Sequence, residues 1–199
     1  MGLGKQAKTL SKLNFTKVFE HVGRKRNGLR NQAIVLLSVK AGLRAKEIAN
    51  LTWAMVLNTD RVIGSHIELT DKASKGRSGR SIPINKELKQ TLEVLYQSSK
   101  NLEGKTIRQK HIISTERQLQ TSPQVIVNMF HRWYAELGLH GCSSHSGRRT
   151  FITNAARKIS TVGGSLRDVQ VLAGHQSLNT TQRYIEQDSQ AQSRVVDII

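Results

Sequence analysis

Residues 42–53 read GLRAKEIANLTW, a short segment that begins with a glycine and ends on a tryptophan. Upstream of it, residues 33–39 (AIVLLSV) are almost wholly apolar, which predicts a largely buried helix. Gly42 suits the left-handed position that commonly ends a helix. A second helix is expected to begin near Arg44 and to turn its apolar side chains inward. The stretch therefore predicts two successive helices separated by a glycine turn.

Arg44 and Glu47 are three residues apart and would share one face of the second helix. An arginine fixed by an acidic neighbour is oriented in advance, and its planar guanidinium fits a phosphate with two parallel hydrogen bonds. Taken alone, such a pair is most often an ordinary surface ion pair. Its meaning depends on the rest of the chain.

A small sheet is expected near the middle of the sequence. Residues 62–69, with Val62 and Ile63 included, predict a strand, and Ser81-Ile82-Pro83-Ile84 predicts a returning strand. The polar, glycine-containing residues 71–79 would form the turn between them. Pro83 cannot donate a backbone hydrogen bond, which places its strand at a sheet edge or a strand end.

The remaining segments predict helices. Residues 86–98 show apolar positions on one face, and Ser122-Pro123 is a typical helix start, followed by an apolar stripe that begins at Val125. Further helices are expected over about 145–158 and from Ser165, where Asp168 stands at the third helical position. The fold class predicted is mostly α with a small antiparallel β-sheet (α+β).

The composition indicates a polyanionic partner. Lys and Arg total 31 of the 199 residues against 14 Asp and Glu, which gives a formal net charge of +17. Nucleic acid is the usual partner of so basic a chain. A structural nucleic-acid protein of the ribosomal type would share this charge. The length suits one domain or two small ones.

The few sequence features that bear on cellular location agree with one another. Cys142 is the single cysteine, so an internal disulfide is impossible and a reducing cytoplasm fits. No apolar run approaches the roughly 18 residues of a membrane helix. The N-terminus lacks the apolar centre of a signal peptide. We therefore expect a cytoplasmic protein that acts on DNA and has no membrane partner.

Two further groups could do chemistry. His145 and Arg148 are three residues apart, and Gly174-His175 is followed nine positions later by Tyr184. Each group is weak evidence alone, because isolated His and Tyr side chains are more often structural than catalytic.

Their order resembles the tyrosine recombinase, or phage integrase, family. The resemblance extends from about Leu13 to Tyr184, and it is carried by motifs in a fixed order. These are the segment 42–53, a Lys-bearing hairpin with Arg80-Ser81-Ile82-Pro83-Ile84, His145-x-x-Arg148-Arg149-Thr150-Phe151, and Leu172-Ala173-Gly174-His175 through Thr180-Thr181-x-x-Tyr184. In the hairpin, the spacing to Arg80 favours Lys75 over Lys72.

The resemblance implies a site-specific recombinase that cuts and rejoins DNA through a 3′-phosphotyrosine link. It implies that Tyr184 is the nucleophile, and that Arg44 and Arg148 neutralise the phosphate with the help of His175. It further implies His145 as the base and Lys75 as the acid for the leaving 5′-oxygen. Glu47 would orient this set rather than touch DNA. These roles are chemically sensible, because charge builds on the phosphate oxygens during attack.

No cofactor is expected, because the phosphotyrosine link conserves the energy of the broken bond. The sequence has no glycine-rich phosphate loop and no acidic metal cluster. A zinc site at His140, Cys142 and His145 is the weaker alternative, since its spacing matches no standard zinc pattern.

The sequence departs from the family pattern at a few positions. Arg149 stands where many members have a second His, residues 54–56 lack a common acid, and Ala173 replaces a common Leu. We expect a basic arm over residues 1–12, a catalytic domain over 13–188 and a tail over 189–199. The chain resembles small members with only the catalytic domain, such as those that invert fimbrial promoter segments.

The expected partners are double-stranded DNA and further copies of the chain, as a dimer to tetramer on DNA, with possible DNA-bending helper proteins. The apolar end of the tail would dock on a neighbouring subunit or fold back on its own core. Two rival functions remain: a type IB topoisomerase and a DNA-binding regulator on a recombinase fold.

Overall fold

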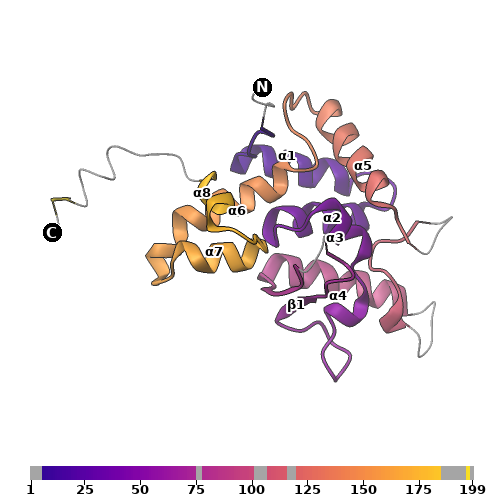
Figure 1. Cartoon of the computed structure of the whole chain (residues 1–199). Coiled ribbons are helices and arrows are strands. Elements are labelled where there is room, and N and C mark those ends of the chain that lie inside the picture. Colours follow the sequence, from indigo (N-terminus) through magenta and orange to yellow (C-terminus); the bar gives the residue numbers. More distant parts are fainter. Residues whose placement is uncertain (1–5, 75–77, 101–106, 116–119, 185–195, 198–199) are drawn as a thin grey trace.

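The structure is a computed structural model that describes residues 6–74, 78–100, 107–115, 120–184 and 196–197 (Figure 1). Eight α-helices and two strands occur in these ranges, with three short 3₁₀ turns. The helices are α1 Lys12–Gly23, α2 Gly28–Lys40, α3 Ala45–Asn50, α4 Lys86–Lys100, α5 Pro123–Glu136, α6 Ser146–Lys158, α7 Leu166–Ala173 and α8 Leu178–Gln182. The strands are β1 His66–Leu69 and β2 Arg80–Pro83, and the turns are η1 Trp53–Met55, η2 Ile107–Gln109 and η3 Ile159–Val162. The predicted class, mostly α with a small antiparallel sheet, is confirmed.

Helix α2 lies at the centre of the molecule and packs against α1, α4 and α6 (Figure 1). Its residues 33–37 are fully buried. As the sequence predicts, α2 ends just before Gly42, which has a φ of +66°, and α3 begins one residue after Arg44. Ile48 and Leu51 are also fully buried, so this corner is anchored on both sides by the large core.

The sheet is a two-stranded antiparallel hairpin. Ile67 of β1 lies opposite Ile82 of β2, and both side chains are buried. The prediction that Val62 and Ile63 belong to the first strand is wrong. Val62 is 53% exposed and stands in a tight loop, where its backbone N–H donates to the Asn58 side chain. Turn-forming residues before it override the strand preference of valine.

Helix α5 begins as predicted, with the Ser122 side chain accepting from the backbone N–H of Val125. The predicted apolar stripe is partly wrong, because Val125 is 41% exposed while Tyr134 is buried. Helix α7 also begins as predicted, with a capping box between Ser165 and Asp168.

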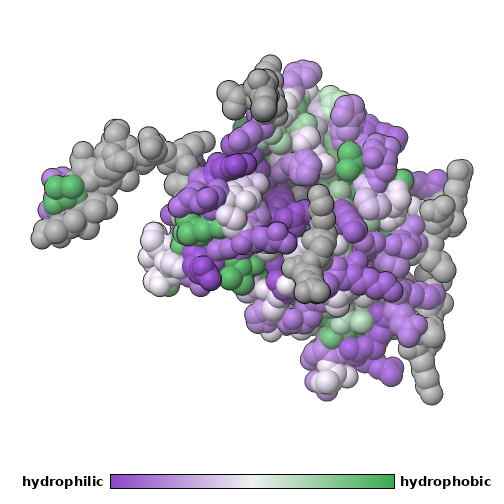
Figure 2. Space-filling view, viewed as in Figure 1, coloured by the Kyte–Doolittle hydropathy of each residue, from purple (hydrophilic) through white to green (hydrophobic). Residues whose placement is uncertain are grey.

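A second, smaller apolar cluster lies between α6, α7 and α8. Its buried residues are Ile152, Val169 and Ala173, and Tyr184 packs against its edge. In Figure 1 these three helices form a separate side of the molecule, next to α2. The outer surface seen in Figure 2 is mostly hydrophilic. None of the helices within the described ranges is long and apolar enough to cross a membrane.

Residues 6–11, the described part of the predicted basic arm, run along α6. The backbone N–H of Lys8 donates to the Gly141 carbonyl at 3.0 Å, and that of Leu10 donates to Thr150 Oγ1 at 2.8 Å. Leu10 is buried in the large core. The segment just before α1 is therefore part of the folded unit.

Candidate active site

Arg44 is fixed at the start of α3 by Glu47. The Arg44 backbone N–H donates to Glu47 Oε2, and Arg44 Nη1 donates to Oε1, both at 2.8 Å. The Glu47 side chain is fully buried, whereas that of Arg44 is 27% exposed. The acid therefore lies beneath the arginine and leaves part of the guanidinium accessible.

Glu47 has a second buried partner, Arg80 of β2. Arg80 Nη1 donates to Glu47 Oε1 at 3.0 Å and Nη2 donates to Oε2 at 3.2 Å. Burial alone would raise the pKa of Glu47, but the hydrogen bonds and positive charges of Arg80 and Arg44 outweigh it. The pKa therefore lies below the ordinary value, and Glu47 is ionised.

Arg148 lies in the first turn of α6, where this helix approaches α2 closely. A Cβ atom on the preceding Gly147 would lie 2.2 Å from Ser38 Oγ, so only glycine permits this approach. Arg148 is 4% exposed. Its Nη1 donates to the Gly42 carbonyl at 2.7 Å and its Nη2 to the Ala173 carbonyl at 2.6 Å.

Arg148 stays positively charged although its side chain is buried. Desolvation and the nearby charge of Arg44 lower the pKa of Arg148 to about 10. The guanidinium therefore stays protonated at neutral pH. Two cationic side chains, Arg44 and Arg148, thus approach one cavity.

His175 follows the end of α7, where Gly174 adopts a left-handed conformation with a φ of +61°. His175 Nδ1 and the buried Thr181 Oγ1 are 3.0 Å apart and hydrogen-bonded. Burial, together with the charges of Arg148, Arg44 and Arg80, lowers the pKa of His175 to about 4. The imidazole is therefore neutral at physiological pH.

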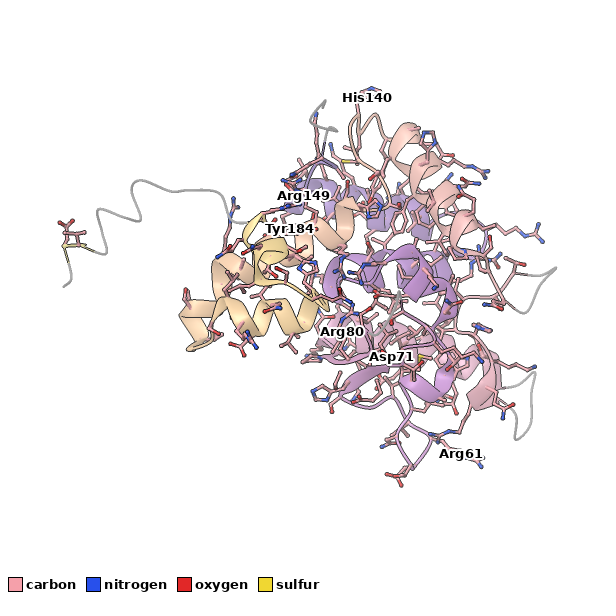
Figure 3. The ribbon with its side chains drawn as sticks, viewed as in Figure 1. Arg61, Asp71, Arg80, His140, Arg149 and Tyr184 are labelled. Carbon is pink, nitrogen blue, oxygen red and sulfur yellow. The ribbon has the colours of Figure 1, made fainter. Side chains whose placement is uncertain are left out.

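Tyr184 lies two residues beyond the end of α8 and beside these groups. Its ring stacks on that of His175, with centroids 5.7 Å apart and an interplanar angle of 24°. The Arg149 guanidinium carbon is 6.0 Å from the centroid of the Tyr184 ring. Figure 3 shows Arg149 and Tyr184 next to each other and Arg80, the first residue of β2, farther from both.

One cavity of about 480 Å³ brings the predicted residues together. Its lining includes five of the seven predicted site residues: Arg44, His145, Arg148, His175 and Tyr184. Glu47 lies behind Arg44, out of contact with solvent. Lys75 lies outside the described residues. His145 is exposed at the start of α6, on the rim formed by the residues before that helix.

The sequence profile of the phage integrase family matches residues 8–191. The chain belongs to this family. Among curated proteins, it is 29% identical over 158 residues to the tyrosine recombinase XerD of Neisseria meningitidis, covering 79% of this chain and 50% of that protein. It is 32% identical over 161 residues to XerC of Rickettsia canadensis, covering 78% and 47%. The chain spans about half the length of the curated relatives it matches.

Solved structures of a recombinase and of a transposon integrase share the fold. The crystal structure of XerA recombinase matches with a TM-score of 0.73 and 22% identity, covering 94% of this chain and 63% of that one. The Tn1549 transposon integrase in complex with a circular intermediate DNA matches with a TM-score of 0.74 and 17% identity, covering 99% and 67%. The predicted recombinase fold is thereby confirmed.

The sequence alone gives no role to two residues that contact this site in the phage integrase family member. Arg80 belongs to the hairpin motif, and Thr181 belongs to the segment before Tyr184. No local pattern reveals that Arg80 reaches Glu47, 33 residues earlier. For Thr181, the six-residue spacing from His175 is compatible with many arrangements.

The described ranges contain no group of three His, Cys, Asp or Glu side chains placed to bind a metal ion. In this part of the integrase-family fold, His140, Cys142 and His145 therefore do not form the alternative zinc site.

Proposed function

We propose that this chain is a site-specific DNA recombinase that cleaves and rejoins strands through a 3′-phosphotyrosine intermediate. One observation supports this best. Two guanidinium groups, a neutral imidazole and a phenol, from segments up to 140 positions apart, line a single cavity. A cavity with this lining suits a phosphodiester, whose reaction requires neutralisation of its anionic oxygens.

In this mechanism, Arg44 and Arg148 donate to the two non-bridging oxygens of the scissile phosphate. With Nδ1 accepting from the Thr181 hydroxyl, His175 carries its proton on Nε2 and donates a further hydrogen bond from there. The lowered pKa of His175 suits this task, since a neutral imidazole donates one hydrogen bond and takes up no proton. Glu47 keeps Arg44 in position without touching DNA.

Tyr184 Oη attacks phosphorus and forms the new O–P bond as the bond to the 5′-oxygen breaks. The phenolic proton passes to a base, for which we propose His145. The leaving 5′-oxygen takes a proton from Lys75. The reverse steps, with the 5′-hydroxyl of another strand, rejoin DNA without a metal ion or nucleotide. The number of phosphodiester-type bonds is unchanged, so no external energy is consumed.

The substrate proposed is double-stranded DNA in the cytoplasm, and the formal net charge of +17 supports it. We expect steep salt dependence, with affinity falling by at least about tenfold between 50 and 200 mM salt. Near-constant affinity over this range would contradict DNA binding through phosphate contacts. We also propose assembly on DNA as a dimer to tetramer, aided by the tail 189–199 or by DNA-bending helper proteins.

Covalent trapping tests the function directly. The reagent is a pool of nicked duplexes with randomised sequence around the nick, so that the short 5′-hydroxyl fragment diffuses away after cleavage. Wild-type protein should form an adduct stable in SDS, and sequencing of the trapped DNA should identify the preferred site. Tyr184→Phe should form none, whereas Tyr134→Phe, the same change at a buried tyrosine outside the cavity, should behave as wild type.

The two rivals give different results in this assay. A DNA-binding regulator would bind the selected duplex and form no adduct with any variant. A type IB topoisomerase would form the adduct but would also relax supercoiled plasmid that lacks the selected site. Exchange of strands between two selected duplexes would support the recombinase.

A further inference from the structure

Arg80 is a buried cation that the proposed mechanism does not use. Its side chain is 4% exposed, and it makes four hydrogen bonds with three parts of the fold. Two go to the carboxylate of Glu47, one goes to the Leu172 carbonyl at 2.9 Å, and one goes to the Ser78 carbonyl at 3.1 Å. A buried charge satisfied at this many points is fixed in one orientation.

The first of these contacts reaches Arg44 through Glu47. Each oxygen of Glu47 accepts one bond from Arg44 and one from Arg80, so the carboxylate lies between the two residues. Without Arg80, Glu47 would lose two of its four donors while remaining fully buried. A buried carboxylate that loses its partners is costly and tends to protonate. A neutral Glu47 would no longer orient the Arg44 guanidinium.

The second contact reaches His175 through the end of α7. The last carbonyls of a helix have no partner within it and form its negative end. In α7, Arg80 binds the Leu172 carbonyl and Arg148 binds that of Ala173. A Cβ atom on Gly174 would lie 2.8 Å from Arg80 Nη1, so the glycine makes room for this guanidinium. His175 follows at once.

We infer that Arg80 is a positioning residue for DNA cleavage, setting Arg44 through Glu47 and His175 through the end of α7. This inference rests on the proposed recombinase function. Arg80 does not contact the scissile phosphate in this account, because all its described bonds are to protein groups and its side chain is buried. It links strand β2, the catalytic arginine and the catalytic histidine into one rigid unit.

The test uses the selected nicked duplex with Arg80→Met and Arg80→Lys. Arg80→Met should slow covalent trapping by about 100-fold, while affinity for the duplex falls by less than about threefold. Arg80→Lys keeps the positive charge but loses the planar guanidinium that binds both oxygens of Glu47, so trapping should slow by about tenfold. Arg167→Met is the matched control: it is exposed and lines the same surface depression as Arg80, and its trapping rate should stay within about twofold.

The pH profile separates positioning from mere stability. The charged groups that face Glu47 are Arg44, Arg80 and Arg148, from α3, β2 and α6. Removal of Arg80 raises the pKa of Glu47, because burial persists and the strongest opposing donor is gone. The acidic limb of the trapping rate should therefore shift to higher pH in Arg80→Met. In Arg80→Lys it should stay near that of the wild type.

Three outcomes would overturn the inference. The first is trapping by Arg80→Lys at the wild-type rate, which also decides the matter if Arg80→Met fails to fold. The second is a loss of trapping matched by an equal loss of DNA affinity, which would make Arg80 a DNA contact. The third is an unshifted pH profile in a folded Arg80→Met. If wild-type protein forms no adduct, the proposed function itself fails, and the inference with it.

Discussion

The large core around α2 and the small cluster between α6, α7 and α8 support different parts of the cavity. The large core fixes Arg44 and Glu47, because α3 is anchored by fully buried side chains. The small cluster supports His175 and Tyr184, and only three of its side chains are buried. Helix α8, which ends two residues before Tyr184, is five residues long.

We infer from this difference that the large core keeps the phosphate-binding arginine rigid, whereas the small cluster allows the nucleophile more movement. Groups that neutralise a phosphate must be fixed before reaction, since reorganising them would cost energy in the transition state. A nucleophile that forms and later releases a covalent bond benefits from a less rigid support. Regions with few buried apolar contacts open at the lowest free-energy cost. We expect substitutions in the two regions to have correspondingly different effects.

The largest effect is expected at Arg148, which joins the two regions through the carbonyls of Gly42 and Ala173. The single ammonium nitrogen of Arg148→Lys cannot replace both Nη atoms and still reach a phosphate, so trapping should slow by at least about 1000-fold. The melting temperature should also fall. Arg132→Lys, at an exposed arginine of α5, is the control and should change neither quantity. Trapping by Arg148→Lys within tenfold of wild type would contradict a direct role.

A matched pair of isoleucines compares the regions themselves. Ile34 and Ile152 are both fully buried, one in each cluster. Ile34→Ala should lower the free energy of unfolding by about 4 kcal/mol and Ile152→Ala by about 2 kcal/mol, because a sparse cluster collapses around a cavity more readily. Urea unfolding measures both values.

For the trapping rate, we expect the two variants to rank in the opposite order from their loss of stability. Ile152→Ala should slow trapping more than Ile34→Ala, since its neighbours position His175 and Tyr184. Equal destabilisation, or a larger catalytic loss in Ile34→Ala, would show that the two clusters act as one.

A smaller effect is expected from pH. The pKa of His175 falls from 6.5 to about 4 on folding, so the folded state binds this proton less readily than the unfolded state. The resulting stability is fully present above pH 6.5 and is lost as the pH falls towards 4. His175→Gln should therefore lose less stability than wild type between pH 7 and 4.5. Parallel curves for the two proteins would contradict the lowered pKa.

The smallest effect is expected at Arg149, where many family members have histidine. Its guanidinium lies 6.0 Å from the Tyr184 ring centroid, a weak contact at a partly exposed site. Arg149→His should therefore change the trapping rate by less than about fivefold. Arg149→Glu reverses a charge that lines the cavity and should slow trapping far more. A loss above about 100-fold in Arg149→His would make Arg149 a member of the catalytic set.

Much of the site could be predicted because its motifs are local. The glycine turn before Arg44, the three-residue spacing of Arg44 and Glu47, and the helix start near His145 each follow from neighbouring residues. The structure confirms these elements. Their convergence on one cavity was expected from the order of the motifs, which no single segment encodes.

The sequence predictions that were wrong or missing involve either two local signals that compete or contacts between distant segments. Val62 has strand propensity, but the turn residues before it dominate. Val125 fits a helical stripe, but it lies nine positions from the buried Tyr134, on the opposite face of α5, and is 41% exposed. The role of Arg80 depends on partners 33 and 92 positions away, which spacing rules cannot identify.

Mass spectrometry of the trapped adduct tests the central claim most directly. The adduct on the selected duplex would be digested with nuclease and protease, and the peptides searched for an attached nucleotide. The account predicts a nucleotide joined through its 3′-phosphate to Tyr184 and to no other side chain. A nucleotide found on a serine or on another tyrosine, with Tyr184 unmodified, would contradict it.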